Sequence, residues 1–258
     1  MKKNYIEYDN SHWSKIKDSD AALNKYLNNY KDIYNRINIE KIKDAIPNKS
    51  KLKILDYGGG IGFLSAELKK LGHEITLADQ SEEALSTAAY YFKKENLNIN
   101  ILKAEKGYFN TDNKYDIIIA KDLIEHVIED KRMFEDLFNL LEDEGKLILT
   151  TQNSFSLNFL IEGTYNKIKN PNKKWLGWDR THIRFYTPNK LKKLAINLNV
   201  KKIQFKSSYI FPYKLFDISL NKLFGIKKTS FFKIDLALMK VSFLGKYGWN
   251  IMMICQKD

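Results

Sequence analysis

A short, largely apolar stretch that runs directly into an acid and a glycine-rich loop constrains this chain more than any other feature. Residues 52–55 are followed by Asp56, and glycines then occupy most of positions 58–62. Apolar residues recur at helical spacing over residues 63–71. Glycine lets the backbone turn sharply and approach a ligand closely, because no Cβ intervenes, and a helix start offers free N–H groups. Strand, glycine turn and helix in this order predict the nucleotide-type binding corner of a parallel α/β sheet.

The spacing of the glycines argues against a dinucleotide. A loop of the form G-x-G-x-x-G needs a third glycine, but Phe63 or Ser65 stands there, depending on which glycine begins the count. Asp56 at the head of the loop would also repel a pyrophosphate. The pattern present is D-x-G-x-G-x-G, which starts at Asp56 and has its glycines at Gly58, Gly60 and Gly62. By itself, such a loop is also compatible with a simple tight turn.

A second acid supports the ligand-binding interpretation. Residues 73–79 alternate and end in Asp79, as a second parallel strand would, and Asp79 lies 23 positions after Asp56. An acid about 20 residues beyond a glycine loop, at the tip of the second strand, typically binds ribose hydroxyls. The alternative is that Asp79 is the N-cap of a helix over residues 81–92. The glycine loop and Asp79 together favour the ribose-binding role.

The chain beyond this point continues to alternate between strands and helices. Extended segments at residues 98–103, 115–120 and 146–151 are separated by helical patterns. The run 115–120 is apolar apart from Asp116 and is bounded by charge, as in a strand that is buried on both faces. This rhythm predicts an α/β fold with a doubly wound, mostly parallel sheet.

The remaining segments suggest two parts, a helical cap and a main domain. We expect the cap over the ligand site at residues 1–50, where Tyr5 and Trp13 are candidate lining residues. The main domain is expected at residues 51–258, with a loop-like lid at 152–185, an apolar and basic insertion at 210–245, and a last strand at 249–256.

The composition limits the class of protein. The chain has 258 residues, of which 44% are hydrophobic, which is enough for a sizeable core. It contains no run of 18 apolar residues and no N-terminal signal pattern, so we expect a cytoplasmic location. A single cysteine, Cys255, excludes an internal disulfide. The net charge of +12 favours an anionic partner such as a phosphorylated metabolite, nucleic acid or membrane surface, although a lysine-rich and asparagine-rich composition can also arise from genome bias.

The motif that begins at Asp56, together with Asp79 and the later strands, resembles the class I S-adenosylmethionine-dependent methyltransferases. The resemblance implies a seven-stranded Rossmann-like sheet and S-adenosylmethionine as the cofactor, whose cationic amino group and sulfonium suit an acid at the strand end. Within this class, the segment 179–187 resembles the Thr-His-x-Arg-Phe-x-Thr segment of ubiquinone-biosynthesis-type O-methyltransferases. That segment also occurs among methyltransferases of cell-surface saccharide pathways.

The resemblance and the strand positions give a set of candidate cofactor contacts. An acid after the third strand often faces the adenine amino group in this class, which makes Glu105 a candidate. Arg36 is a candidate for the cofactor carboxylate, and Lys121, at the end of the fourth strand, for an anionic group. The predicted cofactor-binding residues are Asp56, Gly58, Gly60, Gly62, Asp79, Gln80, Glu105, Lys121 and Arg36.

A candidate metal site follows the fourth strand. Asp122, Glu125 and His126 fall at i, i+3 and i+4, so they would share one face of a helix. Together with His182 they offer oxygen and nitrogen donors that suit Mn²⁺, Mg²⁺, Fe²⁺ or Zn²⁺. The group resembles the acid-x-x-Glu-His motif of small-RNA 2′-O-methyltransferases, although the first acid is Asp here. The alternative is a site without metal, in which His182 or His126 is the general base.

We therefore expect an S-adenosylmethionine-dependent O-methyltransferase acting on a hydroxyl of a small, anionic or sugar-like metabolite. An RNA 2′-O-methyltransferase is the alternative enzyme, favoured by the positive charge but without a recognisable appended RNA-binding module. A third possibility is a non-catalytic partner protein that keeps the fold and uses residues 210–245 for interaction with a protein or a membrane surface.

Overall fold

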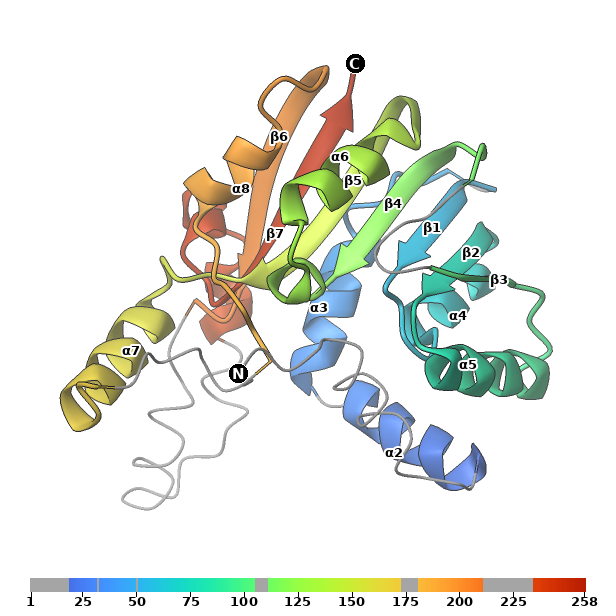
Figure 1. Cartoon of the computed structure of the whole chain (residues 1–258), viewed down its shortest axis with the longest axis horizontal. Helices are drawn as coiled ribbons and strands as arrows, with labels where there is room; N and C mark the ends of the chain where they lie inside the picture. The colour runs from blue at the N-terminus through green and yellow to red at the C-terminus, as the bar shows by residue number, and fades with distance from the viewer. Residues whose placement is uncertain (1–18, 32, 50, 105–110, 173–180, 211–233) are drawn as a thin grey trace.

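A single seven-stranded sheet forms the centre of the protein (Figure 1). The computed structural model describes residues 19–31, 33–49, 51–104, 111–172, 181–210 and 234–258. The strands are β1 (Lys53–Tyr57), β2 (Glu74–Asp79), β3 (Asn100–Lys103), β4 (Tyr115–Lys121), β5 (Leu141–Gln152), β6 (Val200–Ser208) and β7 (Asn250–Lys257). The longer described helices are α2 (Ser19–Lys31), α3 (Ile33–Lys43), α4 (Phe63–Lys70), α5 (Glu82–Lys94), α6 (Asp130–Asn139), α7 (Leu157–Lys169) and α8 (Pro188–Leu194), and short 3-10 turns occur at η1 (Ile124–His126) and η2 (Ser242–Lys246).

The strand order is β3-β2-β1-β4-β5-β7-β6. Strands β1 to β5 pair in parallel, and β7 lies antiparallel between β5 and β6. The chain builds outward from β1 to β3 and then returns to place β4 on the other side of β1. Ligands bind outside the carboxyl ends of the strands at such a reversal. The predicted doubly wound α/β fold is confirmed, and its reversal lies between the glycine loop after β1 and the segment after β4.

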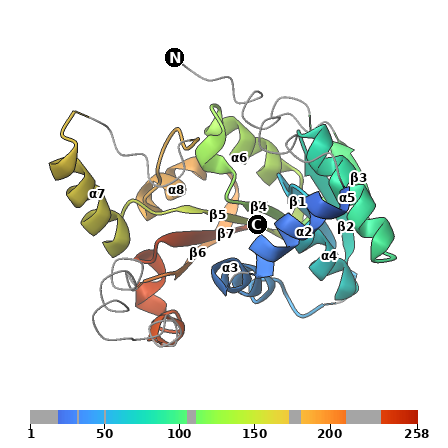
Figure 2. The ribbon, with the colours of Figure 1, turned by 90° about the horizontal axis from the view of Figure 1, so that it is seen from below.

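Helices cover both faces of the sheet (Figure 2). One core combines side chains from α2, α3, α4 and α5, and the other combines side chains from α6 and α8. Strand residues alternate between the two cores because successive side chains of a strand point to opposite faces. On β5, Ile148 belongs to the first core, whereas Leu147 and Leu149 belong to the second. We call these two sides the α3 face and the α6 face.

Two sequence expectations about local structure are wrong. The segment after β4 is not a helix that begins at Asp122: Asp122 has a positive φ of 49°, and only the short turn η1 follows. Residues 157–169, expected to be loop, form α7, whose N-cap Ser156 accepts a hydrogen bond from the backbone N–H of Phe159 at 3.1 Å. Within the described ranges, none of the helices is long and apolar enough to cross a membrane.

Candidate active site

The glycine loop between β1 and α4 adopts a conformation that requires glycine. Gly58, Gly60 and Gly62 have φ values of 73°, 57° and 73°, in the left-handed region that side chains rarely adopt. A Cβ on Gly62 would lie 2.3 Å from the Phe92 ring, and one on Gly58 would lie 2.7 Å from the Leu123 side chain. The loop is therefore packed between α5 and the segment after β4, and its backbone forms the floor of the predicted cofactor site.

Asp56 lies beneath this loop. Its side chain is 1% exposed, and it accepts a hydrogen bond from the Ser65 hydroxyl at 2.7 Å. Burial raises the pKa of Asp56 to about 6, even though the Ser65 hydrogen bond and the Lys121 ammonium act in the opposite direction. A carboxylate this buried attracts a cation above it strongly, because little water screens the charge. The buried Asp56 carboxylate therefore suits a cofactor that carries a cationic group.

Asp79 connects the loop to the next helix. One carboxylate oxygen accepts from the N–H of Gly60 at 2.8 Å, and the other accepts from the N–H of Ser81 at 2.9 Å. Ser81, not Asp79, is the N-cap of α5, because its hydroxyl accepts from the N–H of Ala84. A carboxylate can accept several hydrogen bonds, so the chemistry of Asp79 suits ribose hydroxyls as well as the backbone of the loop.

An aromatic residue of the N-terminal helix also lies at the loop. Tyr30 at the end of α2 stacks on Phe63, the first residue of α4, with ring centroids 4.8 Å apart and planes inclined by 3°. Burial raises the pKa of Tyr30, the Lys121 ammonium lowers it, and the Asp56 carboxylate raises it further. Tyr30 therefore faces the same space as these charged groups. Tyr30 could not be predicted from the sequence, since no local pattern distinguishes it from other aromatic residues of the helix.

The other predicted cofactor contacts differ in burial, and some lie outside the described residues. Gln80 follows Asp79 and is half-buried. Arg36 is exposed on α3. Glu105 lies outside the described residues, as do Tyr5 and Trp13.

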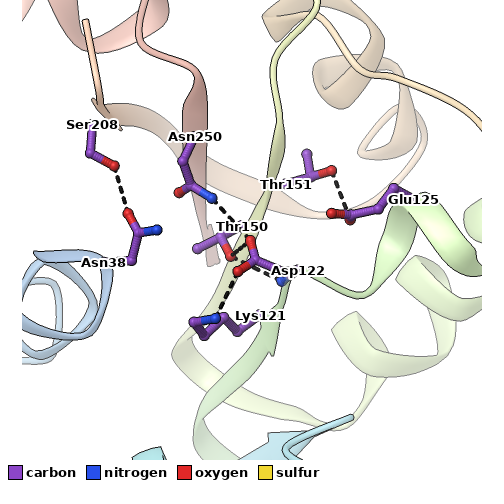
Figure 3. Close-up of polar contacts among 8 residues, drawn as sticks. All are labelled: Asn38, Lys121, Asp122, Glu125, Thr150, Thr151, Ser208 and Asn250. Atoms are coloured by element: carbon purple, nitrogen blue, oxygen red, sulfur yellow. Dashed lines mark hydrogen bonds and ion pairs between the residues drawn. The ribbon is translucent and has the colours of Figure 1, made fainter. Parts of the chain in front are cut away.

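Lys121 is the last residue of β4, and Asp122 follows it directly (Figure 3). The Lys121 ammonium donates to the Asp122 carboxylate at 2.7 Å. The same carboxylate accepts from the Thr150 hydroxyl at 2.8 Å and from the Asn250 amide at 3.0 Å. Burial alone would raise the pKa of Asp122, but Lys121 and the hydrogen bonds outweigh it, so the pKa is lowered. Asp122 is thus an ionised member of a hydrogen-bonded group on the α3 face.

This arrangement corrects the predicted metal set. Asp122 does not share a helical face with Glu125 and His126, because its left-handed backbone turns its carboxylate toward Thr150. A non-glycine residue in this region carries backbone strain, which is concentrated at functional sites.

Glu125, His126 and His182 do come together. One donor atom from each lies within 4.8 Å of the others. The two imidazole rings meet edge to face, with centroids 4.8 Å apart. Glu125 is 1% exposed and accepts from the Thr151 hydroxyl at 2.8 Å. Burial and the nearby Asp122 carboxylate raise the pKa of Glu125 to about 8.

The chain that supplies His182 is held on the α6 side. The guanidinium of Arg184 pairs with Asp130 at 2.6 Å, and the Tyr186 hydroxyl donates to the same carboxylate at 2.6 Å. The N–H of Ile183 donates to the carbonyl of Glu125 at 3.0 Å. Arg184 therefore anchors the segment to α6.

The glycine loop lies close to the Glu125–His126–His182 cluster. The Leu123 side chain packs against Gly58, so the loop and the Glu125–His126–His182 cluster flank one short segment. The loop side can bind a cation-bearing nucleoside, and the cluster can accept a proton or bind a divalent metal.

Comparisons with known proteins agree with this geometry. Residues 30–204 match a family model described as a methyltransferase domain. The ubiquinone biosynthesis O-methyltransferase of Rickettsia prowazekii (strain Madrid E) is 34% identical over 123 residues, which are 48% of this chain and 49% of that protein. The enzyme of the same name from Rickettsia bellii (strain OSU 85-389) is 29% identical over 170 residues, 63% of this chain and 67% of that protein. The chain thus spans about half to two thirds of the length of these relatives.

Solved structures share the fold. Phosphoethanolamine N-methyltransferase 2 from Haemonchus contortus, in complex with S-adenosyl-L-methionine, superposes with a TM-score of 0.63 at 13% identity, covering 99% of this chain and 60% of that one. An S-adenosylmethionine-dependent methyltransferase from Clostridium acetobutylicum ATCC 824 has a TM-score of 0.55 at 15% identity, covering 91% and 98%. Because the family model matches most of the chain, the chain belongs to the methyltransferase-domain family.

Proposed function

We propose that the protein transfers the methyl group of S-adenosylmethionine to a hydroxyl of a small, anionic or sugar-like metabolite. The observation that carries the proposal is the position of Leu123, which packs against Gly58 and directly precedes the turn that carries Glu125 and His126. A site for the cofactor therefore borders a site that can take up a proton. The names of the Rickettsia relatives, ubiquinone biosynthesis O-methyltransferases, support oxygen as the methylated atom.

The chemistry requires little of the protein beyond position and proton removal. The methyl group on a sulfonium is already activated, so the enzyme chiefly brings the acceptor oxygen into line with it. The hydroxyl must lose its proton as it attacks. His126 and His182 are the groups whose ordinary pKa suits a general base near neutral pH, and the Thr181 hydroxyl lies 3.1 Å from Nδ1 of His126, where it orients the ring.

The same cluster fits a divalent metal. A buried carboxylate and two imidazoles form a mixed oxygen and nitrogen set, which Mn²⁺, Fe²⁺ and Zn²⁺ accept and Mg²⁺ tolerates. Glu125, His126 and His182 would hold the ion, and Thr151 would orient Glu125 through its hydrogen bond. Such an ion, when bound, lowers the pKa of an oxygen it contacts.

An RNA 2′-O-methyltransferase is the second candidate. The net charge of +12 favours it, since an excess of lysine and arginine attracts phosphate. The intact glycine loop and the two hydrogen bonds to Asp79 disfavour a non-catalytic partner protein, because they preserve the features that a cofactor needs.

Calorimetry and a transfer assay test the proposal. The protein should bind S-adenosylhomocysteine, and radioactive methyl should pass from S-adenosylmethionine to hydroxyl-bearing acids of low molecular weight. Methylation of total RNA, together with competition between RNA and small acceptors, would favour the RNA enzyme. Absence of S-adenosylhomocysteine binding would contradict both enzymatic proposals.

A further inference from the structure

A row of polar side chains crosses three strands at the carboxyl edge of the sheet, and the proposed chemistry uses none of them. Gln152 on β5 is the direct cross-strand partner of Asn250 on β7, and Asn250 is the partner of Ser208 on β6. Directly opposed residues point to the same face. That face is the α3 face, because Asn250 donates to the Asp122 carboxylate, which the Thr150 hydroxyl also contacts (Figure 3). The row therefore begins beside the end of β4 and leads away from the cofactor loop.

Helix α3 places two buried polar side chains against the far end of this row. The Lys41 ammonium donates to the Ser208 hydroxyl at 2.9 Å, and that hydroxyl donates to the Asn38 side-chain oxygen at 2.6 Å. Lys41 is 7% exposed. Among the described residues, no carboxylate lies within ion-pair distance of its ammonium. An ammonium buried without a counter-ion is costly, so an anion that reached Lys41 would be bound strongly.

The same row holds acceptors that the described part of the chain leaves without donors. The side-chain oxygens of Asn250 and Gln152 are buried and receive no hydrogen bond from the residues that the structure describes. The orientation of the Asn250 amide is determined by its neighbour, because its nitrogen donates to the Asp122 carboxylate, which is ionised and only accepts. Native proteins rarely leave buried acceptors unmatched. Donors from a ligand, such as hydroxyl groups, would complete them.

We propose that the row Gln152–Asn250–Ser208, together with Lys41, binds the part of the methyl acceptor that carries a carboxylate beside hydroxyl groups. One ammonium matches the single charge of a carboxylate, whereas a phosphate dianion would need more donors than the row offers. The two amide oxygens accept from hydroxyls. The contact between Asn250 and Asp122 places this subsite next to the end of β4, at the same edge of the sheet as the cofactor loop. The inference rests on the proposed function and narrows its substrate to hydroxy acids of the uronic acid type.

The alternative is that Lys41 and Asn38 only attach α3 to β6. Measuring proton uptake when the ligand binds distinguishes a ligand-binding Lys41 from a purely structural one. Burial lowers the pKa of Lys41 to about 7, against the attraction of Asp122 and Asp235 and with the repulsion of Lys206. At pH 8 the amine is therefore mostly neutral, and an arriving carboxylate should make it take up a proton. A purely structural lysine would show no uptake that depends on the ligand.

The experiment is calorimetry at pH 8 with protein saturated by S-adenosylhomocysteine, in two buffers that differ in ionisation enthalpy. Glucuronate is the test ligand. Glucose is the control without a charge, and glucose 6-phosphate is the control with a phosphate in place of the carboxylate. We expect glucuronate to bind at least about tenfold more tightly than glucose, with uptake of about 0.5–1 proton per molecule. Lys41→Met should abolish the uptake and the preference. Gln152→Leu should weaken the binding of both sugars but keep the proton uptake. Lys202→Met, which removes an exposed charge from β6, the strand of Ser208, should change neither.

Equal binding of glucuronate and glucose, or the same proton uptake in Lys41→Met as in the original protein, would overturn the inference. Tighter binding of glucose 6-phosphate than of glucuronate would overturn the assignment to a carboxylate. If Lys41→Met does not fold, proton uptake by the unaltered protein on binding glucuronate still tests the inference, and absence of that uptake would overturn it. Failure of S-adenosylhomocysteine to bind would contradict the proposed function itself, whereas its binding without any glucuronate binding would contradict this inference alone.

Discussion

Thr150 and Thr151 are neighbours on β5, yet their hydroxyls donate to carboxylates on opposite faces of the sheet. Thr150 donates to Asp122 at 2.8 Å on the α3 face, and Thr151 donates to Glu125 at 2.8 Å on the α6 face (Figure 3). The alternation of side chains along a strand produces this division. One strand end therefore supports two polar groups, the Lys121–Asp122 pair and the Glu125–His126–His182 cluster.

Asp79→Ala should weaken binding of S-adenosylhomocysteine by about 2–3 kcal/mol, because it removes a charge-assisted acceptor together with the bonds that shape the loop. Asp79→Asn should lose less, since the amide oxygen still accepts one of the N–H groups of Gly60 and Ser81. Asp112→Asn, at an exposed position, is the control. Unchanged affinity in Asp79→Ala, measured by calorimetry, would remove this residue from the cofactor site.

Asp56→Asn should stabilise the protein at neutral pH while weakening cofactor binding. The pKa of Asp56 is raised from 3.8 to about 6 in the folded state, so the native protein holds the proton more tightly than the unfolded chain. The free energy of unfolding therefore falls as pH rises between about 4 and 6, by roughly 3 kcal/mol for this group. In Asp56→Asn, the free energy of unfolding should not show this contribution to its decrease with rising pH. Urea unfolding at pH 4.5 and 7.5 measures it, and parallel pH profiles for both proteins would refute the assignment.

Chelation should abolish methyl transfer and leave S-adenosylhomocysteine affinity unchanged, because Asp56 and Asp79 lie apart from the cluster. Glu125→Gln and His182→Ala should lose bound metal in elemental analysis. Asp122→Asn should keep it, since that carboxylate contacts Lys121, Thr150 and Asn250 instead. Full activity in excess chelator, with no metal bound, would leave His126 and His182 as general base and orienting neighbour.

Tyr30 and Phe63 should couple energetically. The stacked pair joins α2 to the first residue of α4, and such pairs contribute about 0.5–1.5 kcal/mol beyond the burial of area. A double-mutant cycle with Tyr30→Ala and Phe63→Ala, followed by urea unfolding, should give a coupling energy in this range. Tyr30→Phe keeps the stack and should retain stability. Additive effects of the two alanine substitutions would show that the rings do not support each other.

Cofactor binding should protect the cap and the region after β5 from hydrogen exchange. The expectation covers residues 1–30 and 152–185, of which the structure describes 19–30, 152–172 and 181–185. Closure of such segments excludes water from a transfer reaction. Peptides from these regions should exchange more slowly with S-adenosylhomocysteine present, whereas peptides from the exposed end of β6 near Val200 should not change. Equal exchange in both states would argue against a lid.

Local sequence pattern was enough to predict several parts of this protein. The strands, the glycine loop and Asp79 were predictable because alternation, backbone freedom and the position of an acid at a strand end act over a few residues. Even the meeting of Glu125, His126 and His182 was expected, though by way of a helix that does not form. The helix expected from Asp122 to His126 is absent because Asp122 has a left-handed backbone, which residue spacing alone does not predict.

Which polar groups meet depends on how the elements pack in three dimensions. Asp122 turns to Asn250, a residue 128 positions away, and Lys41 meets Ser208 across 167 positions. Tyr30 finds Phe63 because α2 packs beside the loop. No spacing in the chain specifies these contacts. They follow from the order of strands, which brings β6 and β7 beside β5, and from the free energy cost of leaving buried polar groups without partners.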